Sequence, residues 1–385
     1  MKKNVLFVID EKMMGGVAVL LSDIINRINI SKYNIDVLVL HNRGDYLDDL
    51  PKGVNIIYGT KFFNTIDYTF KEVLNSKNIK KIISKMRVVF LMKTKLIGRR
   101  IIKERKKILT KKYDVEVAFK DGFTAIFTAY GDSLKKYHWL HSDYSMYDCT
   151  GNYHSLFMEI FPKFDKIIAI SKSVLERFKK KYNVHNTEVI YNIVDQNKIV
   201  KMANQETINF DKNKINLISV GRIHEMKGYS RLIDVLSKLN KEKKLENVVT
   251  RLIGDGPEYN LVKNKIIENN LEDKVLLMGR MKNPFPYVKA SDLFLMCSHY
   301  EPFGLVIIEA LSCGIPVLSL DVASIKEIMD SKYGMIFENS EDGLYEGILS
   351  IINNPKKLDV FKKNLLNYHY NIEKIIKQIE DLLDE

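Results

Sequence analysis

Two glutamates, Glu301 and Glu309, bracket a short apolar segment that begins just after a proline and a glycine. If this span is helical throughout, its eight positions separate the two carboxylates by about 12 Å along the axis. The unpaired N–H groups and the dipole of a helix N-terminus form an anion site. Here those amides are expected from four consecutive residues, Phe303, Gly304, Leu305 and Val306. An anion site with a hydroxyl acceptor at each end suits a sugar nucleotide, in which sugars flank a diphosphate.

A simpler interpretation makes both glutamates ordinary surface charges, because most glutamates are solvated. Glu309, however, lies in a segment of residues 305–311 that is apolar almost all round, which indicates a buried helix. A buried carboxylate needs a partner. Pro302 is expected in the first turn of this helix, where its missing N–H costs nothing. The burial of Glu309 therefore favours the ligand site over the surface charge.

The pattern E-P-F-G-L-x-x-x-E-A-L-x-x-G-x-P-V over residues 301–317 resembles the Glu-x7-Glu signature of glycosyltransferase family 4. Members of this family are retaining enzymes of the GT-B fold. The resemblance implies that Glu301 contacts hydroxyls of the donor sugar and that Glu309 holds the ribose. It also implies that the amides of residues 304–306 bind the diphosphate.

A second loop carries two cations directly after a strand expected over residues 215–220. Arg222 and Lys227 follow Gly221 there, and Gly228 opens the next helix. Cations at the carboxyl end of a strand suit a departing diphosphate, although any single lysine is more simply a surface charge. The sequence G-R-x-x-x-x-K-G resembles the family's diphosphate loop. Arg222 and Lys227 are therefore expected to act with Glu301 in catalysis.

Two more strands of this half end in loops that are expected to contact the donor. Gly254 follows a strand over residues 248–253, in a tight turn before a helix. Arg280 and Met281 follow a strand over residues 276–279, and the resemblance implies that the backbone of this loop reads the base.

The N-terminal half contributes a glycine pair and a histidine. A glycine pair, Gly15 and Gly16, opens a helix after the first strand; it is either a plain helix start or a close approach to a ligand. His141 follows a short strand at residues 137–140, and a lone histidine is usually structural or exposed. The resemblance implies that Gly16 faces the donor diphosphate and that His141 lies beside the donor sugar as a catalytic residue. It extends to Asp143 and Tyr144 only weakly.

Strands and helices alternate in two successive halves, which predicts an α/β protein with two facing Rossmann-like domains and a cleft between them. The expected boundaries are residues 1–195 for the acceptor-side domain and 196–368 for the nucleotide-sugar domain. A C-terminal helix over 369–385 is expected to pack back on the first domain. Residues 193–213 are polar and are expected to form the hinge. Tyr191 stands just before it, where members of the resembling family tend to have proline.

The net charge of +12 is concentrated in one segment. Residues 77–112 hold fifteen Lys or Arg residues and the single acid Glu104, so the rest of the chain is slightly acidic. Apolar residues interleave with these cations, which indicates a cationic amphipathic helical region. It is either a solvated helical face or a surface for anionic lipid. Nucleic acid is not expected, because Phe90 is the only aromatic residue in the segment.

Three scattered cysteines, Cys149, Cys297 and Cys313, show no metal-ligand or disulfide spacing and are expected to be buried thiols. The first apolar run covers only residues 5–9, which is too short for a signal peptide. No apolar run reaches the ~20 residues that a membrane-spanning helix needs. We therefore expect a cytoplasmic protein, which would contact the inner face of the membrane if the basic segment binds lipid. The proposed phosphate site has no neighbouring Asp-x-Asp motif, so we expect no metal and no cofactor.

The resemblance implies a retaining glycosyltransferase of the hexosyl class, and the missing Asp-x-Asp motif predicts that it is metal-independent. The expected donor is a nucleotide sugar, UDP-linked by analogy with the family, and the expected acceptor is a hydroxyl of a glycan or lipid-linked glycan in cell-surface polysaccharide synthesis. One alternative is a sugar-nucleotide epimerase, which would turn over donor without acceptor. Another is a non-enzymatic basic membrane-binding module.

Overall fold

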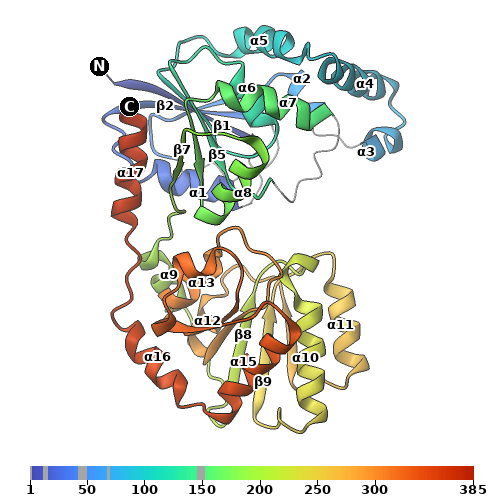
Figure 1. Cartoon of the computed structure of the whole chain (residues 1–385), viewed down its shortest axis with the longest axis vertical. Coiled ribbons are helices and arrows are strands. Elements are labelled where there is room, and N and C mark those ends of the chain that lie inside the picture. Colours follow the sequence, from blue (N-terminus) through green and yellow to red (C-terminus); the bar gives the residue numbers. More distant parts are fainter. Residues whose placement is uncertain (1, 12–15, 42–49, 67–69, 145–151) are drawn as a thin grey trace. The chain divides into compact units, whose positions relative to one another are not determined.

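The structure is a computed structural model of the 385-residue chain, and it describes residues 2–11, 16–41, 50–66, 70–144 and 152–385 (Figure 1). The chain forms two compact units, Met1–Ile193 with Glu373–Glu385, and Val194–Ile372. Each unit is an α/β domain built on one parallel sheet, as the alternating pattern predicts. The cleft between them stays a prediction.

The first unit contains a seven-stranded sheet in the order β3-β2-β1-β4-β5-β6-β7. All neighbouring strands run parallel. The chain leaves β1 first towards β2 and later returns beside it as β4, so the strand order reverses between β1 and β4. The strands are β1 (Lys3–Glu11), β2 (Tyr33–His41), β3 (Asn55–Tyr58), β4 (Val115–Ala118), β5 (Lys135–Leu140), β6 (Lys166–Ala169) and β7 (Thr187–Val189).

Helices pack around this sheet, and the last helix of the chain joins them. Lys3 Nζ lies 2.6 Å from the carbonyl of Asp384, and the Tyr33 hydroxyl donates to the Asp384 carboxylate at 2.9 Å. These bonds fasten α17 to β1 and β2 (Figure 1). The helices are α1 (Gly16–Ile25), α2 (Lys61–Asn64), α3 (Phe70–Asn75), α4 (Ile79–Lys93), α5 (Ile97–Ile108), α6 (Phe123–Ala129), α7 (Asn152–Ile160), α8 (Lys172–Tyr182) and α17 (Ile372–Asp384).

The basic segment forms two separate helices, α4 and α5. The break falls at residues 94–96, where Lys95 has a φ of 56°. A residue with positive φ cannot continue a right-handed helix. The predicted helical region is confirmed and consists of two helices, which have different surroundings.

The second unit contains a six-stranded parallel sheet in the order β10-β9-β8-β11-β12-β13. Strand β8 is flanked by β9, the next strand along the chain, and by β11, so the order reverses between β8 and β11. The strands are β8 (Ile215–Val220), β9 (Val248–Ile253), β10 (Val275–Gly279), β11 (Leu293–Met296), β12 (Val317–Leu320) and β13 (Gly334–Phe337).

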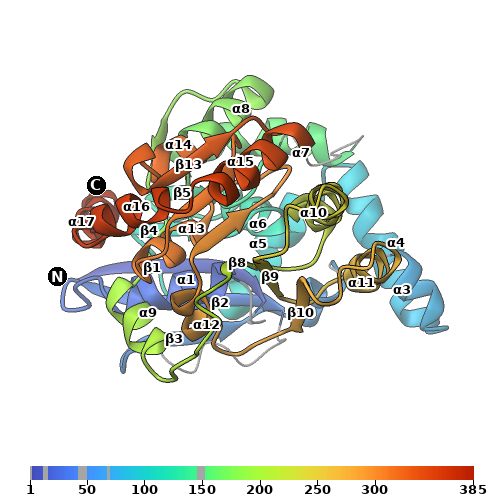
Figure 2. The same cartoon turned by 90° about the horizontal axis from the view of Figure 1, so that it is seen from below.

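Alternate side chains of the buried strands point to opposite faces of this sheet and form two hydrophobic clusters. In β11, Leu293 and Leu295 belong to one cluster and Phe294 and Met296 to the other. Figures 1 and 2 show α10 and α11 on one side of β8 and α12 and α13 on the other. The helices are α9 (Gln196–Ala203), α10 (Tyr229–Lys241), α11 (Tyr259–Glu268), α12 (Phe285–Ala290), α13 (Leu305–Ser312), α14 (Ile325–Ile328), α15 (Glu341–Asn353) and α16 (Lys357–Leu365).

The predicted hinge contains a helix that sequence reasoning missed. The side chain of Asp195 caps α9 by accepting from the Lys198 amide at 3.0 Å. Ile199 and Ala203 of this helix are buried. The segment is thus ordered from residue 196, and its polar composition reflects the exposed side of a short helix.

Among the described residues, every helix is too short or too polar to cross a bilayer. Cys297 and Cys313 are free thiols, and Cys313 is only partly buried. Cys149 lies outside the described residues.

Candidate active site

The strand order of the second sheet reverses between β8 and β11. Loops that leave neighbouring strands in opposite directions separate at the carboxyl edge of a parallel sheet and leave room for a ligand. After β8 the chain runs through residues 221–228, which include a short 3-10 helix, Glu225–Lys227. After β11 it runs through residues 297–304 to α13. The two loops carry five of the predicted site residues, which are Arg222, Lys227, Glu301, Phe303 and Gly304.

A cation and a carboxylate join these two loops. Lys227 Nζ lies 2.5 Å from Glu301 Oε2, and the two side chains are 29% and 12% exposed. The amide of His299 also donates to the carbonyl of Met226 at 2.9 Å. The structure thus brings together Lys227 and Glu301, two residues that the sequence predicts to be catalytic and that lie 74 positions apart.

Glycines allow the loops at this edge to approach each other through their backbones. Gly228 has a φ of 70°, and a Cβ atom on it would lie 2.1 Å from the carbonyl oxygen of Cys297. A Cβ atom on Gly254 would lie 1.8 Å from the carbonyl oxygen of Gly221. No side chain fits at either position. Gly254 therefore has a packing role, and its contact with the donor stays a prediction.

Helix α13 carries Glu309 and begins after Glu301, later than predicted. Gly304 is its N-cap, with a φ of 95°, and the first helical residue is Leu305. Pro302 and Phe303 form a bend before the helix, so the expectation of Pro302 in the first turn was wrong. The left-handed Gly304 sets the start of the helix, and the unpaired amides of its first turn begin with Leu305 and Val306.

A buried serine that sequence reasoning missed holds the bend in place. Ser324 Oγ lies 3.0 Å from the carbonyl oxygen of Glu301 and 3.1 Å from that of Phe303. Ser324 follows β12, so its position beside the bend depends on the tertiary fold. No spacing in the sequence identifies it.

Glu309 lies on α13 between buried residues and is half-buried itself. Its burial raises the pKa to about 7, against the opposing effect of the Lys227 charge. Among the residues that the structure describes, none donates a hydrogen bond or forms an ion pair with this carboxylate. The helix was predicted to be buried and is so at the four residues around Glu309, whereas Glu309 itself is half-buried. The partner that its carboxylate needs can come from a ligand.

The remaining predicted residues of this unit lie at the ends of neighbouring strands. Arg222 is exposed and directly follows Gly221 after β8. Arg280 is exposed after β10, and Met281 beside it is half-buried against the hydrophobic cluster that contains Phe294. All three share the carboxyl edge of the sheet with Lys227, and their contacts with a donor stay predictions.

The first unit has its own polar cluster at the point where its strand order reverses. Lys120, after β4, lies 2.6 Å from the Asp10 carboxylate on β1. Asp121 accepts from the backbone amide of His141 at 3.1 Å. Burial raises the pKa of Asp121 to about 7. Sequence reasoning found His141 but missed Asp121, which accepts from its amide, and the Lys120–Asp10 pair, because these residues belong to other parts of the sheet.

His141 is half-buried, and its imidazole lies beside two aromatic rings. Its ring centre lies 4.9 Å from that of Phe119 and 6.4 Å from that of Trp139, to which it is parallel. Burial lowers the pKa of His141 to about 3, so the imidazole is neutral near pH 7. Its Nε2 atom is buried and has no hydrogen-bond partner in the described part of the chain.

The other N-terminal expectations fall into two groups. Asp143 accepts from Arg177 at 2.8 Å, and the Tyr144 hydroxyl accepts from the Gly122 amide at 3.1 Å, so both are held inside the unit. Gly16 is exposed as the first residue of α1, while Gly15 lies outside the described residues. The donor contact of Gly16 and the catalytic role of His141 stay predictions.

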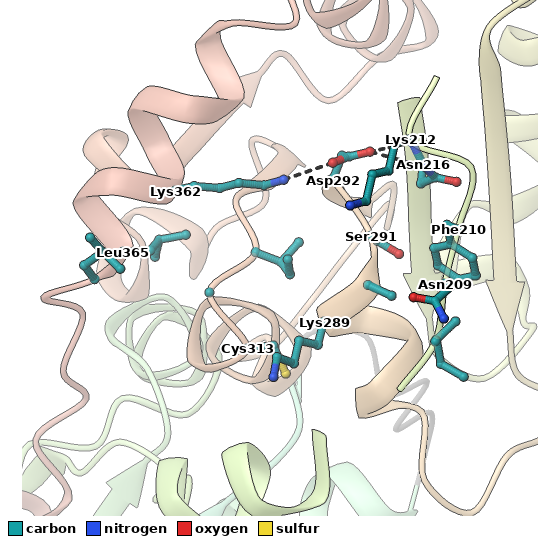
Figure 3. Close-up of a pocket in the computed structure, with 15 residues that line it drawn as sticks. Asn209, Phe210, Lys212, Asn216, Lys289, Ser291, Asp292, Cys313, Lys362 and Leu365 are labelled. Carbon is teal, nitrogen blue, oxygen red and sulfur yellow. Dashed lines mark hydrogen bonds and ion pairs between the residues drawn. The ribbon is translucent and has the colours of Figure 1, made fainter. Parts of the chain in front are cut away.

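A cavity of about 580 Å³ lies at the opposite edge of the second sheet (Figure 3). It is lined near the starts of β8, β11 and β12, where Asn216, Asp292 and Ile315 stand. Lys362 extends towards Asp292 and lies 2.9 Å from its carboxylate. This cavity contains none of the predicted site residues. No group of His, Cys, Asp and Glu side chains in the described ranges has the arrangement of a metal site.

The chain resembles known proteins in the sequence of its second half and in its fold. Residues 200–384 match the family model described as Glycosyl transferases group 1. Among solved structures, HepE of Anabaena in complex with UDP and glucose has a TM-score of 0.72 and 20% identity, over 99% of both chains. That likeness gives the fold.

Two curated relatives come from bacteria. An enzyme of Campylobacter jejuni, N-acetylgalactosamine-N,N'-diacetylbacillosaminyl-diphospho-undecaprenol 4-alpha-N-acetylgalactosaminyltransferase, is 29% identical over 53% of this chain and 55% of its own. A 41.2 kDa protein in the cps region of Klebsiella pneumoniae is 31% identical over 40% of this chain and 42% of its own. The chain thus spans about half the length of these curated relatives.

The two parallel-sheet units have the GT-B fold of the solved neighbours. Residues 200–384, which make up most of the second unit and the C-terminal helix, match the glycosyl transferases group 1 family.

Proposed function

We propose that this protein transfers a sugar from a nucleotide-sugar donor to an acceptor hydroxyl. The observation that carries the proposal is the Lys227–Glu301 pair at the reversal point of the second sheet, beside the first amides of α13. A cation and helix amides suit a diphosphate, and the carboxylates of Glu301 and Glu309 suit sugar hydroxyls. The half-buried Glu309 supports the proposal further, because it has no donor among the described residues.

In the proposed reaction, the bond from the anomeric carbon to the diphosphate breaks and a bond to the acceptor oxygen forms on the same face. Bond formation on the face that the diphosphate leaves retains the configuration, and the acceptor proton passes to the departing phosphate. Lys227, Arg222 and the α13 amides stabilise the leaving charge. We propose that they do so without a metal ion or other cofactor, so a chelator should leave the rate unchanged.

We propose UDP as the nucleotide and a glycan or lipid-linked glycan of the cell surface as the acceptor. The Anabaena neighbour binds UDP, and the Campylobacter relative is named for a diphospho-undecaprenol acceptor. These names support the classes of donor and acceptor. The proposed place of action is the cytoplasmic face of the membrane, where such an acceptor presents its sugar.

The test is nucleotide release from a panel of UDP-, GDP- and ADP-sugars, with slow hydrolysis as the readout when no acceptor is supplied. The proposal predicts release from one donor and its loss in Glu309→Ala. Release accompanied by epimerised donor would instead favour the sugar-nucleotide epimerase. The proposed function is wrong if the protein turns over none of these donors and none of them raises its melting temperature.

A further inference from the structure

Helix α4 exposes a row of large apolar side chains to solvent. Ile79, Ile83, Met86 and Phe90 are 71%, 61%, 61% and 60% exposed. Their spacing of four, three and four residues places them on one side of a helix. Val88, on the opposite side, is buried against the unit. The helix therefore has an inner apolar side that packs and an outer apolar row that is open.

Cations flank this outer row. Helix α4 contains Lys80, Lys81, Lys85, Arg87 and Lys93 and no acidic residue. Lys85 turns inward and donates to the carbonyl of Ile66 at 2.8 Å. Lys80 and Arg87 are exposed along one side of the row, and Lys93 is exposed along the other. A helix with an apolar strip between exposed cations is typical of segments that lie in the interface of an anionic bilayer.

Helix α5, the other half of the basic segment, is engaged within its own unit. Arg105 donates to both oxygens of the buried Glu116, each at 2.7 Å. Arg100 pairs with Glu104 at 2.7 Å. The apolar residues Ile97 and Ile101 of α5 are buried. Cations of α5 therefore stabilise the fold, and the membrane surface expected from the whole segment narrows to α4.

We propose that the outer face of α4 docks on an anionic lipid surface. The helix packs on α3, α5 and α7, and its outer face lies at the periphery of the unit (Figure 1). Charge complementarity selects the occupant: a second copy would bring the same cations against this face, and like charges repel. A nucleic acid would need stacking side chains, and Phe90 is the single aromatic residue of the row. Apolar residues between cations match acyl chains beneath anionic headgroups.

Docking does not depend on sugar transfer, so its test needs no donor and can fail or succeed separately from the proposed function. The full chain is floated with vesicles of phosphatidylcholine, with and without phosphatidylglycerol. We expect binding only when phosphatidylglycerol is present, and weaker binding as salt is raised. A double variant, Ile83→Ser with Phe90→Ser, removes two apolar side chains of the row. It should weaken binding about tenfold or more, because these side chains no longer enter the bilayer.

Paired charge reversals separate α4 from α5 at equal change in net charge. Each cation near an anionic surface contributes roughly fivefold to binding, so Lys80→Glu with Arg87→Glu should reduce it about 25-fold or more. The matched control is Arg99→Glu with Lys103→Glu on α5, where both residues are exposed. This α5 control should reduce vesicle binding several times less than the α4 variant does. Equal losses in the two variants would overturn the proposal, as would wild-type binding by the apolar variant.

A fluorescent probe reports insertion directly. Trp139 is the one tryptophan of the chain and is buried, so it gives a constant background. Phe90→Trp should shift its emission to the blue with phosphatidylglycerol vesicles, whereas Ile102→Trp on α5 should not. Sedimentation of the wild type and of Phe90→Ser tests the other occupants. A dimer abolished by Phe90→Ser, or binding to an oligonucleotide in place of vesicles, would contradict lipid docking.

Discussion

The ammonium group of Lys227 lies 2.5 Å from Glu301 Oε2, across the point where the strand order of the second sheet reverses. The two residues come from the loops after β8 and β11. Without a ligand, the cation expected to meet a diphosphate is thus held by the carboxylate expected to meet a sugar. This pairing makes the two functions separable by mutation.

Glu301→Gln removes the anion that competes for Lys227 and keeps the shape of the side chain. We therefore expect UDP to bind at least as tightly as to the wild type, because the released ammonium pairs with phosphate. Turnover of the donor sugar should fall about tenfold to a hundredfold, since a charge-assisted hydrogen bond is lost. Calorimetry with UDP and single-donor kinetics measure the two effects. A variant with weakened UDP binding and normal turnover would refute this division of roles.

Glu309 should make stability depend on pH. Its pKa in the folded protein is about 7, raised from 4.5. A raised pKa means that its stabilising effect is complete below 4.5 and is lost as pH rises through 7. Glu309→Gln should therefore raise the free energy of unfolding by up to about 3 kcal/mol at pH ~8 and change it little at pH ~4.

Thermal unfolding at the two pH values checks this expectation. The control is Glu346→Gln, which makes the same change at an exposed position on α15 of the same unit. It should have no pH-dependent effect. If Glu309→Gln is equally stable relative to the wild type at both pH values, the carboxylate is not the buried charge described here.

Gly228 and Gly279 offer a matched pair, because both have a φ of 70°. A Cβ atom on Gly228 would meet the Cys297 carbonyl oxygen at 2.1 Å, whereas one on Gly279 has open space. Gly279→Ala should cost about 1 kcal/mol for the left-handed backbone alone. Gly228→Ala should cost about 3 kcal/mol or more, because the two loops must also move apart. Urea unfolding compares them, and similar costs would show that the loops are not in close contact.

The strands of the second unit were predicted well because they are short apolar runs bounded by polar or glycine residues. Strands β8 and β9 have the predicted bounds. The start of α13 was misplaced because Pro302 is also compatible with a bend, and the left-handed Gly304 decides where the helix begins. Helix α9 was missed because only two of its side chains, Ile199 and Ala203, are buried.

Some site residues could be predicted from a local motif, and others could not. Lys227 and Glu301 each stand in a recognisable motif, but their ion pair joins two distant loops and depends on strand order. Ser324 and Asp121 carry no local signal, because their partners lie on other elements. The different surroundings of α4 and α5 were also hidden, since both helices mix cations with apolar residues and what covers each depends on the tertiary fold.

Ser324→Ala should loosen the bend before α13. The variant loses a hydroxyl that bridges the Glu301 and Phe303 carbonyls, so we expect about 1 kcal/mol less stability and a lower kcat/KM. Ser319→Ala is the control, because this serine is equally buried and bonds only within its strand, to Leu320 at 2.8 Å. It should lose similar stability and keep its activity. Unchanged kcat/KM in Ser324→Ala would mean that the bend needs no such support.

Calorimetric titration of UDP, GDP and ADP into the wild type, Lys227→Met and Lys362→Met tests the central claim most directly. Lys362 is the matched lysine, because it lines the cavity at the opposite edge of the same sheet. We predict that one nucleotide binds, that Lys227→Met weakens it about tenfold or more, and that Lys362→Met leaves it unchanged. Binding that Lys362→Met abolishes and Lys227→Met preserves would place the nucleotide in that cavity and contradict the account.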